Sequence, residues 1–125
     1  MMFARVSNAS VLAGTSIFAT RVADHFRRQG WQIDTLDEGE DLNQAVRSLK
    51  ANAVVMDIST GTESGFLTCA KLLRSQPRLQ VILVGSRRRI SDTKFAEFVG
   101  AKGYVCDDDS PSFVLGAISN VLRVA

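Results

Sequence analysis

Ala53-Val54-Val55-Met56-Asp57 is an unbroken apolar run that ends in a carboxylate. Such a run is typical of a strand that is buried on both faces of a parallel sheet, because a half-exposed strand alternates apolar and polar residues. A second apolar run, Val81–Val84, leads into Gly85 and Ser86, and Tyr104-Val105-Cys106 forms a shorter one. These three runs predict neighbouring buried strands of one parallel sheet.

Segments with helical spacing of apolar residues separate these runs. Leu42, Ala45, Val46 and Leu49 recur at the i, i+3, i+4, i+7 positions of a helix face. Another helix is predicted to bury Phe66, Cys69, Ala70 and Leu73 and to end before Pro77, and a short one covers Asp92–Val99. A last helix is predicted to start at Ser110 as the N-cap and Pro111 as the first helical residue.

The N-terminal third of the chain completes the pattern. A strand is predicted over Arg5–Ala13, a helix follows from a Thr15 or Ser16 cap to Gly30, and Trp31–Leu36 alternates like a short strand. Five strands therefore alternate with five helices. This predicts an α/β fold, a doubly wound five-stranded parallel sheet sandwiched by five helices, in one domain over residues 1–125.

Composition narrows the class of protein. Of the 125 residues, 46% are hydrophobic and 22% are charged, which excludes a disordered chain, and a net charge of +2 gives no reason to expect direct nucleic-acid binding. No apolar run reaches the roughly 20 residues of a membrane span, so no membrane association is expected. Cys69 and Cys106 lie far apart and predict two buried thiols in a reducing compartment, so we expect a cytoplasmic protein.

Function is expected at the carboxyl ends of the strands, where doubly wound sheets carry their sites. Together with the sequence Gly100-Ala101-Lys102-Gly103-Tyr104-Val105, the segment from Val54 through Asp57 to Gly65-Phe66 resembles the response-regulator receiver domain. The resemblance extends over almost the whole chain. It implies a flavodoxin-like sheet of the receiver type and a non-enzymatic role in two-component signal transduction.

The residues expected to support phosphorylation in such a domain differ in this sequence. The family phosphorylates the strand-ending aspartate, which Asp57 matches. Ala13 and Gly14 stand where the family has an acidic pair that holds Mg²⁺, Gly85 stands in place of a Thr or Ser, and Asp107 in place of a Lys. The sequence therefore predicts an atypical receiver with no cofactor and no metal, in which Asp57 is vestigial and the activity is phosphorylation-independent.

An interaction surface is the remaining expectation. Arg87, Arg88 and Arg89 lie before the fourth predicted helix, on the side that receivers use for output, and Tyr104 matches the aromatic residue that changes its packing between receiver states. We therefore expect a protein partner or a homodimer at the face of the fourth helix, fifth strand and fifth helix. A fused output domain outside this chain is also compatible with the resemblance.

Alternative functions remain open at this point. Asp57 could accept a phosphoryl group with altered ligands, or Asp107, Asp108 and Asp109 could form a rewired cation site with it. A third reading is a small anionic ligand or nucleotide, held by Gly14, Thr15 and Ser16 together with the Gly85–Arg89 segment, including Ser86. Helix capping explains the same residues at 14–16.

Overall fold

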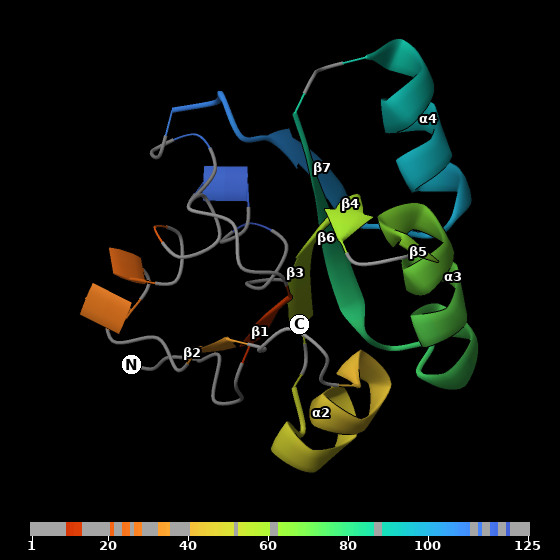
Figure 1. The fold of residues 1–125 in the computed structure, drawn as a ribbon. Coiled ribbons are helices and arrows are strands. Elements are labelled where there is room, and N and C mark those ends of the chain that lie inside the picture. The colour runs from red at the N-terminus through yellow and green to blue at the C-terminus, as the bar shows by residue number, and fades with distance from the viewer. Residues whose placement is uncertain are drawn as a thin grey trace.

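The structure of the chain is a computed structural model, and it describes residues 10–13, 21, 24–25, 27–28, 33–35, 41–51, 53–60, 63–86, 89–110, 113, 116–117 and 120. Five strands form the main sheet, and a two-stranded hairpin and three helices complete the described elements. In chain order these are β1 (Ser10–Ala13), β2 (Ile33–Thr35), α2 (Leu42–Leu49), β3 (Ala53–Asp57), β4 (Ser59–Thr60), β5 (Glu63–Ser64), α3 (Gly65–Ser75), β6 (Gln80–Gly85), α4 (Ile90–Phe98) and β7 (Gly103–Cys106). Figure 1 shows their arrangement.

The main sheet is parallel throughout, with the strand order β2-β1-β3-β6-β7. The order reverses at β1, which lies between β2 and β3, as in a doubly wound sheet. In register, Asp57 lies opposite Val84, and Gly85 lies opposite Cys106, so the ends of three strands meet at one edge. The predicted five-stranded parallel α/β fold is confirmed.

Both faces of the central strands are buried. Val54, Met56, Val81 and Leu83 belong to a core that also contains residues of α2, α3 and α4, which lie on one side of the sheet (Figure 1). The alternate residues of the same strands, such as Val55 and Ile82, are buried as well. This explains the unbroken apolar runs of the sequence, because neither set of side chains faces water. Described helical residues also lie near both ends of the chain, at positions 21–28 and 113–120.

The helices follow the predicted pattern with two corrections, at Leu49 and in α3. Asp41 is the N-cap of α2, where its Oδ1 accepts hydrogen bonds from the N–H groups of Asn43 (3.1 Å) and Gln44 (3.4 Å). Leu49 was predicted on the buried face but is 40% exposed at the end of α2, whereas Val46 in the same turn is buried. In α3 the buried leucine is Leu72, whereas Leu73 is only half-buried, because the helix is rotated relative to the predicted face.

Both cysteines are buried, as predicted. Burial raises the pKa of the Cys69 thiol to about 11, so this group is not a nucleophile at neutral pH. Among the residues that the structure describes, no helix combines the length and the hydropathy needed to span a bilayer.

Candidate functional site at the carboxyl edge of the sheet

The carboxyl edge brings Asp57, Gly85 and Asp107 together, as the sequence predicted. Asp57 ends β3, Gly85 ends β6, and Asp107 directly follows β7. Two backbone hydrogen bonds join the three segments: the N–H of Ile58 donates to Val84 (2.9 Å), and the N–H of Asp107 donates to the carbonyl of Gly85 (2.9 Å). The edge is therefore held by the sheet itself and not by a mobile loop.

The segment after Asp57 folds back on itself. It forms the antiparallel β4–β5 hairpin, and the N–H of Gly65 donates to the carbonyl of Ile58 (2.8 Å). A Cβ on Gly65 would lie 2.5 Å from the Cα of Ile58 and 3.1 Å from the carbonyl carbon of Asp57. This close backbone approach needs a glycine, and it fixes the main chain that carries Asp57.

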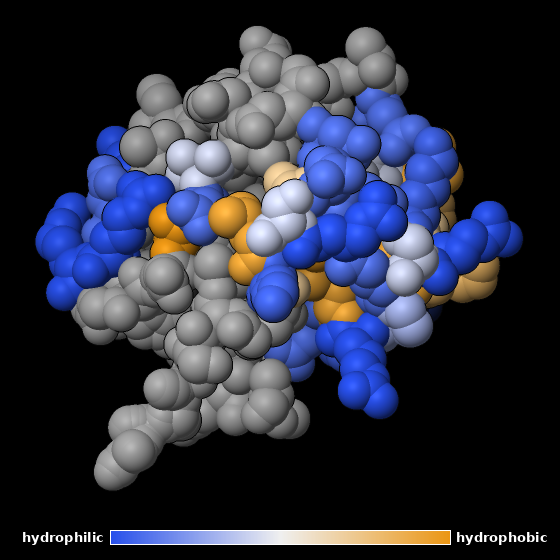
Figure 2. Space-filling view, turned by 90° about the horizontal axis from the view of Figure 1, so that it is seen from below, coloured by the Kyte–Doolittle hydropathy of each residue, from blue (hydrophilic) through white to orange (hydrophobic). Residues whose placement is uncertain are grey.

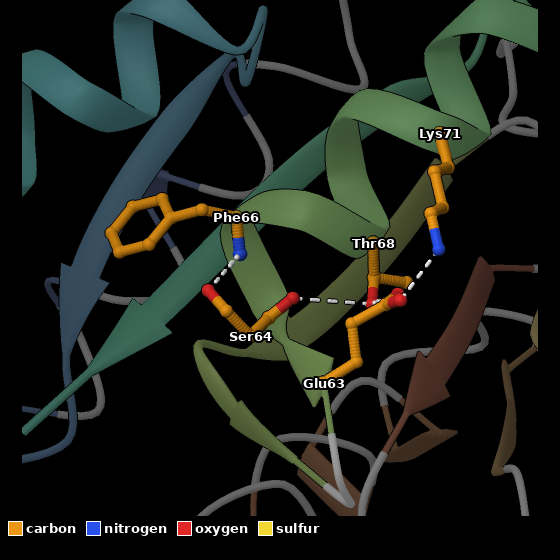
Figure 3. Close-up of polar contacts among 5 residues, drawn as sticks. All are labelled: Glu63, Ser64, Phe66, Thr68 and Lys71. Carbon is orange, nitrogen blue, oxygen red and sulfur yellow. Dashed lines mark hydrogen bonds and ion pairs between the residues drawn. The ribbon is translucent and has the colours of Figure 1, made fainter.

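Side chains of the hairpin attach it to the first turns of α3 (Figure 3). The Ser64 hydroxyl oxygen accepts from the N–H of Phe66 at 3.2 Å and caps the helix. Glu63 accepts hydrogen bonds from Thr68 Oγ1 and from Lys71 Nζ, both at 2.6 Å. These contacts to Lys71 and Thr68 lower the pKa of Glu63, so their stabilisation is present at neutral pH and is lost as the pH falls through that lowered pKa.

The Tyr104 side chain fills the space in which a side chain at position 85 would lie, because Gly85 has none. A Cβ on Gly85 would lie 2.7 Å from Cζ of Tyr104 and closer still to its hydroxyl oxygen. The Tyr104 ring is half-buried, and Leu83 is its register partner on β6. The aromatic side chain thus packs over the end of β6, at the edge where Asp57 and Asp107 lie.

The three aspartates after β7 do not act as one group. Asp109 turns back on its own strand: its Oδ2 accepts from the N–H of Cys106 (2.9 Å), and its own N–H donates to the carbonyl of Cys106 (3.0 Å). Asp107 and Asp108 are exposed. Within the described part of the chain, no three His, Cys, Asp or Glu side chains converge as metal ligands, so this geometry gives no support to the alternative of a cation site built from Asp57 and Asp107–Asp109.

The other predicted site residues are placed only in part. Gly14, Thr15, Ser16, Arg87 and Arg88 lie outside the described residues. Ser86 directly follows β6 and Arg89 directly precedes α4, and both are exposed. Arg89 is the N-cap residue of α4, and its carbonyl accepts from the N–H (3.0 Å) and the hydroxyl (3.1 Å) of Thr93.

Sequence reasoning missed an apolar surface on α4. Phe66 of the core stacks on Phe95 with ring centroids 4.7 Å apart, and Phe95 contacts Phe98 at 6.2 Å. This aromatic series leads from the core to solvent, because Phe95 is 48% and Phe98 is 84% exposed. Ile90, at the other end of α4, is 77% exposed. The signal was present in the sequence, since the apolar residues of 90–98 do not gather on one helix face.

Comparisons with known proteins agree with this geometry. A family model described as the response regulator receiver domain matches residues 15–112. The transcriptional regulatory protein GltR of Pseudomonas aeruginosa is 28% identical over 104 residues, which cover 81% of this chain and 43% of that protein. The probable transcriptional regulatory protein TcrX of Mycobacterium tuberculosis is 27% identical over 107 residues. These residues cover 86% of this chain and 46% of the length of TcrX. The chain spans less than half the length of both curated relatives.

Solved structures show the same fold. The BeF₃-activated N-terminal receiver domain of Klebsiella pneumoniae RstA superposes with a TM-score of 0.82 at 20% identity, over 93% of this chain and 99% of that one. The chemotaxis protein CheY4 of Vibrio cholerae gives a TM-score of 0.79 at 14% identity, over 91% and 98% of the two chains. At these identities the likeness concerns the fold.

Proposed function

Because the chain belongs to the response regulator receiver domain family, we propose that this two-component receiver works without Mg²⁺-dependent phosphorylation of Asp57. It acts in this proposal as a regulatory interaction module and not as an enzyme. The observation that carries the proposal is the packing of Tyr104 over Gly85, at the edge where phosphorylation would take place.

The residues at this edge do not fit Mg²⁺. This cation takes oxygen ligands in near-octahedral geometry. Ala13, at the end of β1, has no oxygen in its side chain, and no three acidic or other ligand side chains converge among the residues that the structure describes. Asp107 adds a negative charge where phosphoryl transfer needs a positive group to neutralise the negative charge of the transferring oxygens.

Tyr104 supports the phosphorylation-independent part of the proposal. At Gly85 there is no hydroxyl to follow a phosphoryl group, and the Tyr104 hydroxyl already fills that space. The Tyr104 side chain lies over Gly85 in the unmodified chain, so in this proposal it needs no covalent signal to reach that position. The receiver would then present one output face at all times, and regulation would come from its partner.

Treatment with Mg²⁺ and acetyl phosphate is expected to leave the mass of the chain unchanged. The donor set at the edge neither binds the cation nor neutralises the transferring phosphoryl group, so Asp57 has no activation as a nucleophile. Intact-mass spectrometry measures this directly. A phosphoryl adduct on the wild-type chain that is lost in Asp57→Asn would contradict the proposal and favour Asp57 as an unconventional phosphoacceptor.

A rebuilt chain provides the positive control for this experiment. The variant Gly14→Asp/Gly85→Thr/Asp107→Lys restores an acid, a hydroxyl and a cation at the positions that match the family pattern. It is expected to gain a phosphoryl adduct under the same conditions, and Asp57→Asn in that background is expected to lose it. This pair separates a failure of the assay from a genuine lack of activity.

For the interaction surface we propose that a second copy of the chain packs on α4. The exposed Ile90, Phe95 and Phe98 provide the apolar contact. Arg89 precedes the helix, and Glu97 lies in its last turn, and both are exposed. Two copies of α4 that pack antiparallel about a two-fold axis would place each Arg89 near the other Glu97, which makes the surface self-complementary.

Replacing Phe98 by serine is expected to shift the chain from dimer to monomer in analytical ultracentrifugation. Leu67→Ser is the matched control, because Leu67 is an exposed apolar residue of another helix, α3. Arg89→Glu is expected to weaken the dimer and Arg89→Glu/Glu97→Arg to restore it, since the swap re-forms the charge pair. A wild-type chain that stays monomeric at every concentration would reject the homodimer and leave a protein partner.

The curated relatives add a proposal about the rest of the signalling protein. Both are transcriptional regulatory proteins more than twice as long as their matched segments. We propose that this receiver likewise controls an output domain, which would lie outside the 125 residues of the printed sequence.

A further inference from the structure

A groove opens at the edge of the sheet opposite to Asp57, between the end of α2 and the loop that joins α3 to β6. Its volume is about 560 Å³, within the roughly 300–1,000 Å³ typical of small-ligand sites. Val46, Pro77 and Leu79 form its apolar part, and Val46 and Leu79 are buried. Figure 2 views the molecule from below, where hydrophilic side chains flank apolar surface.

Three cations line this groove: Arg47, Lys50 and Arg78. None of the described residues that line it is acidic, and neither of the two ion pairs found in the described part of the chain involves any of the three. Arg47 and Lys50 lie at the C-terminal end of α2, where the negative end of the helix dipole stabilises positive charge, so the helix alone explains these two cations. It does not account for Arg78, which lies outside the helices and adds a third positive charge to the same rim.

The walls of the groove are fixed relative to each other. The Asn43 Oδ1 atom, on α2, accepts hydrogen bonds from Gln76 Nε2 (2.7 Å) and from the Ser75 hydroxyl (3.4 Å) at the end of α3. The N–H of Leu79 donates to the carbonyl of Gln76 (3.1 Å) and closes the loop beneath. The walls of the groove are therefore fixed before a ligand binds, whereas the exposed side chains of Arg47, Lys50 and Arg78 would be ordered by the ligand.

Lys50 adds a second indication. It has a left-handed conformation, with φ 52° and ψ 42°, at the position after α2 where glycine is the usual residue. A lysine is less stable than a glycine in this conformation, and here it places a charge at the groove.

We propose that this groove binds a small organic phosphate, of the nucleotide class, whose phosphates contact the cationic rim and whose ring lies on the apolar part. Arginine side chains bind phosphate oxygens through two parallel N–H groups, which suits Arg47 and Arg78. The accessible apolar surface beside the rim comes from the exposed Pro77 and the half-buried Ala51, over the buried Val46 and Leu79, and it suits an uncharged ring. An inorganic phosphate would use only the rim, and a nucleoside only the apolar part.

ATP, inorganic triphosphate and adenosine are the probes for this site, without Mg²⁺ and on the whole chain. ATP is expected to bind with one-to-one stoichiometry in isothermal titration calorimetry and to shift the backbone amide resonances of Val46 and Leu79. Triphosphate and adenosine are each expected to bind at least about tenfold more weakly, because each lacks half of the contacts. Absence of ATP binding at about 1 mM, or shifts confined to the Asp57 edge, would overturn the proposal.

Variants of the rim separate a specific site from general attraction between charges. Arg47→Gln/Arg78→Gln is expected to weaken ATP binding about tenfold or more. The control Arg21→Gln/Lys94→Gln removes the same charge from exposed helical positions outside the groove and is expected to bind ATP like the wild type. An equal loss in both pairs would overturn the proposal, and unchanged thermal unfolding of all variants verifies that they are folded. Because these measurements use neither Mg²⁺ nor Asp57, their outcome is independent of the proposed receiver function.

Discussion

Replacing Gly65 by alanine is expected to lower the free energy of unfolding by about 2–4 kcal/mol. The new Cβ would overlap the carbonyl oxygen of Asp57 and the Cα of Ile58, and both are backbone atoms that cannot rotate away. Relief therefore requires the chain after β3 to move, which breaks the hydrogen bond from the Gly65 N–H to Ile58 (2.8 Å). Urea unfolding followed by circular dichroism measures the change.

Gly116→Ala is the control for this substitution. Gly116 is an exposed helical residue, and a Cβ there meets no atom within 4 Å. The same chemical change is expected to raise the free energy of unfolding by about 0.5–1 kcal/mol, because alanine favours a helix over glycine. If both variants changed stability in the same direction, the close approach at Gly65 would not be the cause.

Replacing Gly85 by threonine is expected to displace the Tyr104 ring and to lower the free energy of unfolding by about 1–3 kcal/mol. The hydroxyl end of the ring now lies where the threonine Cβ must be. Removing the ring by Tyr104→Ala relieves this overlap, so the double variant is expected to be more stable than the sum of the single changes predicts, by about 1–2 kcal/mol. Urea unfolding of the four chains gives this coupling energy.

Tyr104 also reports on its own position, since it is the one tyrosine in the sequence. Its ring resonances in an NMR spectrum are expected to shift in Gly85→Thr toward values for a solvent-exposed ring. Ser86→Thr, one residue later at an exposed position, is the control and is expected to leave them unchanged. Additive stabilities together with an unmoved ring would show that Gly85 and Tyr104 are not coupled.

The fold was predictable because its signal is strong in the sequence. Apolar runs such as Val81–Val84 can be buried on both sides only in a covered parallel sheet, and the structure has that sheet. The positions of Asp57, Gly85 and Asp107 followed from the same reasoning, because the carboxyl ends of parallel strands share an edge. The ends of these central strands can therefore be predicted from the apolar runs of the sequence.

Contacts between distant residues were not predictable in the same way. The β4–β5 hairpin depends on the Gly65 backbone reaching Ile58, and the packing of Tyr104 on Gly85 joins two strands. Periodicity reports which face a residue occupies, not the partner that it meets there. The groove between α2 and the segment before β6 was missed for that reason, since Arg47 and Arg78 are 31 positions apart in the printed sequence and neither carries a motif.

The strand order also has a consequence for how the chain folds as it is synthesised. From Ala53 onward, chain order and sheet order agree, because β6 is added to β3 and β7 is added to β6. Each of these strands can attach to an edge that already exists when it leaves the ribosome. β1 differs, because it pairs with β2 and with β3, and its second partner follows about 40 residues later. One edge of β1 therefore stays unpaired until β3 is synthesised, and the arrival of β3 both completes the pairing of β1 and creates the edge to which β6 attaches.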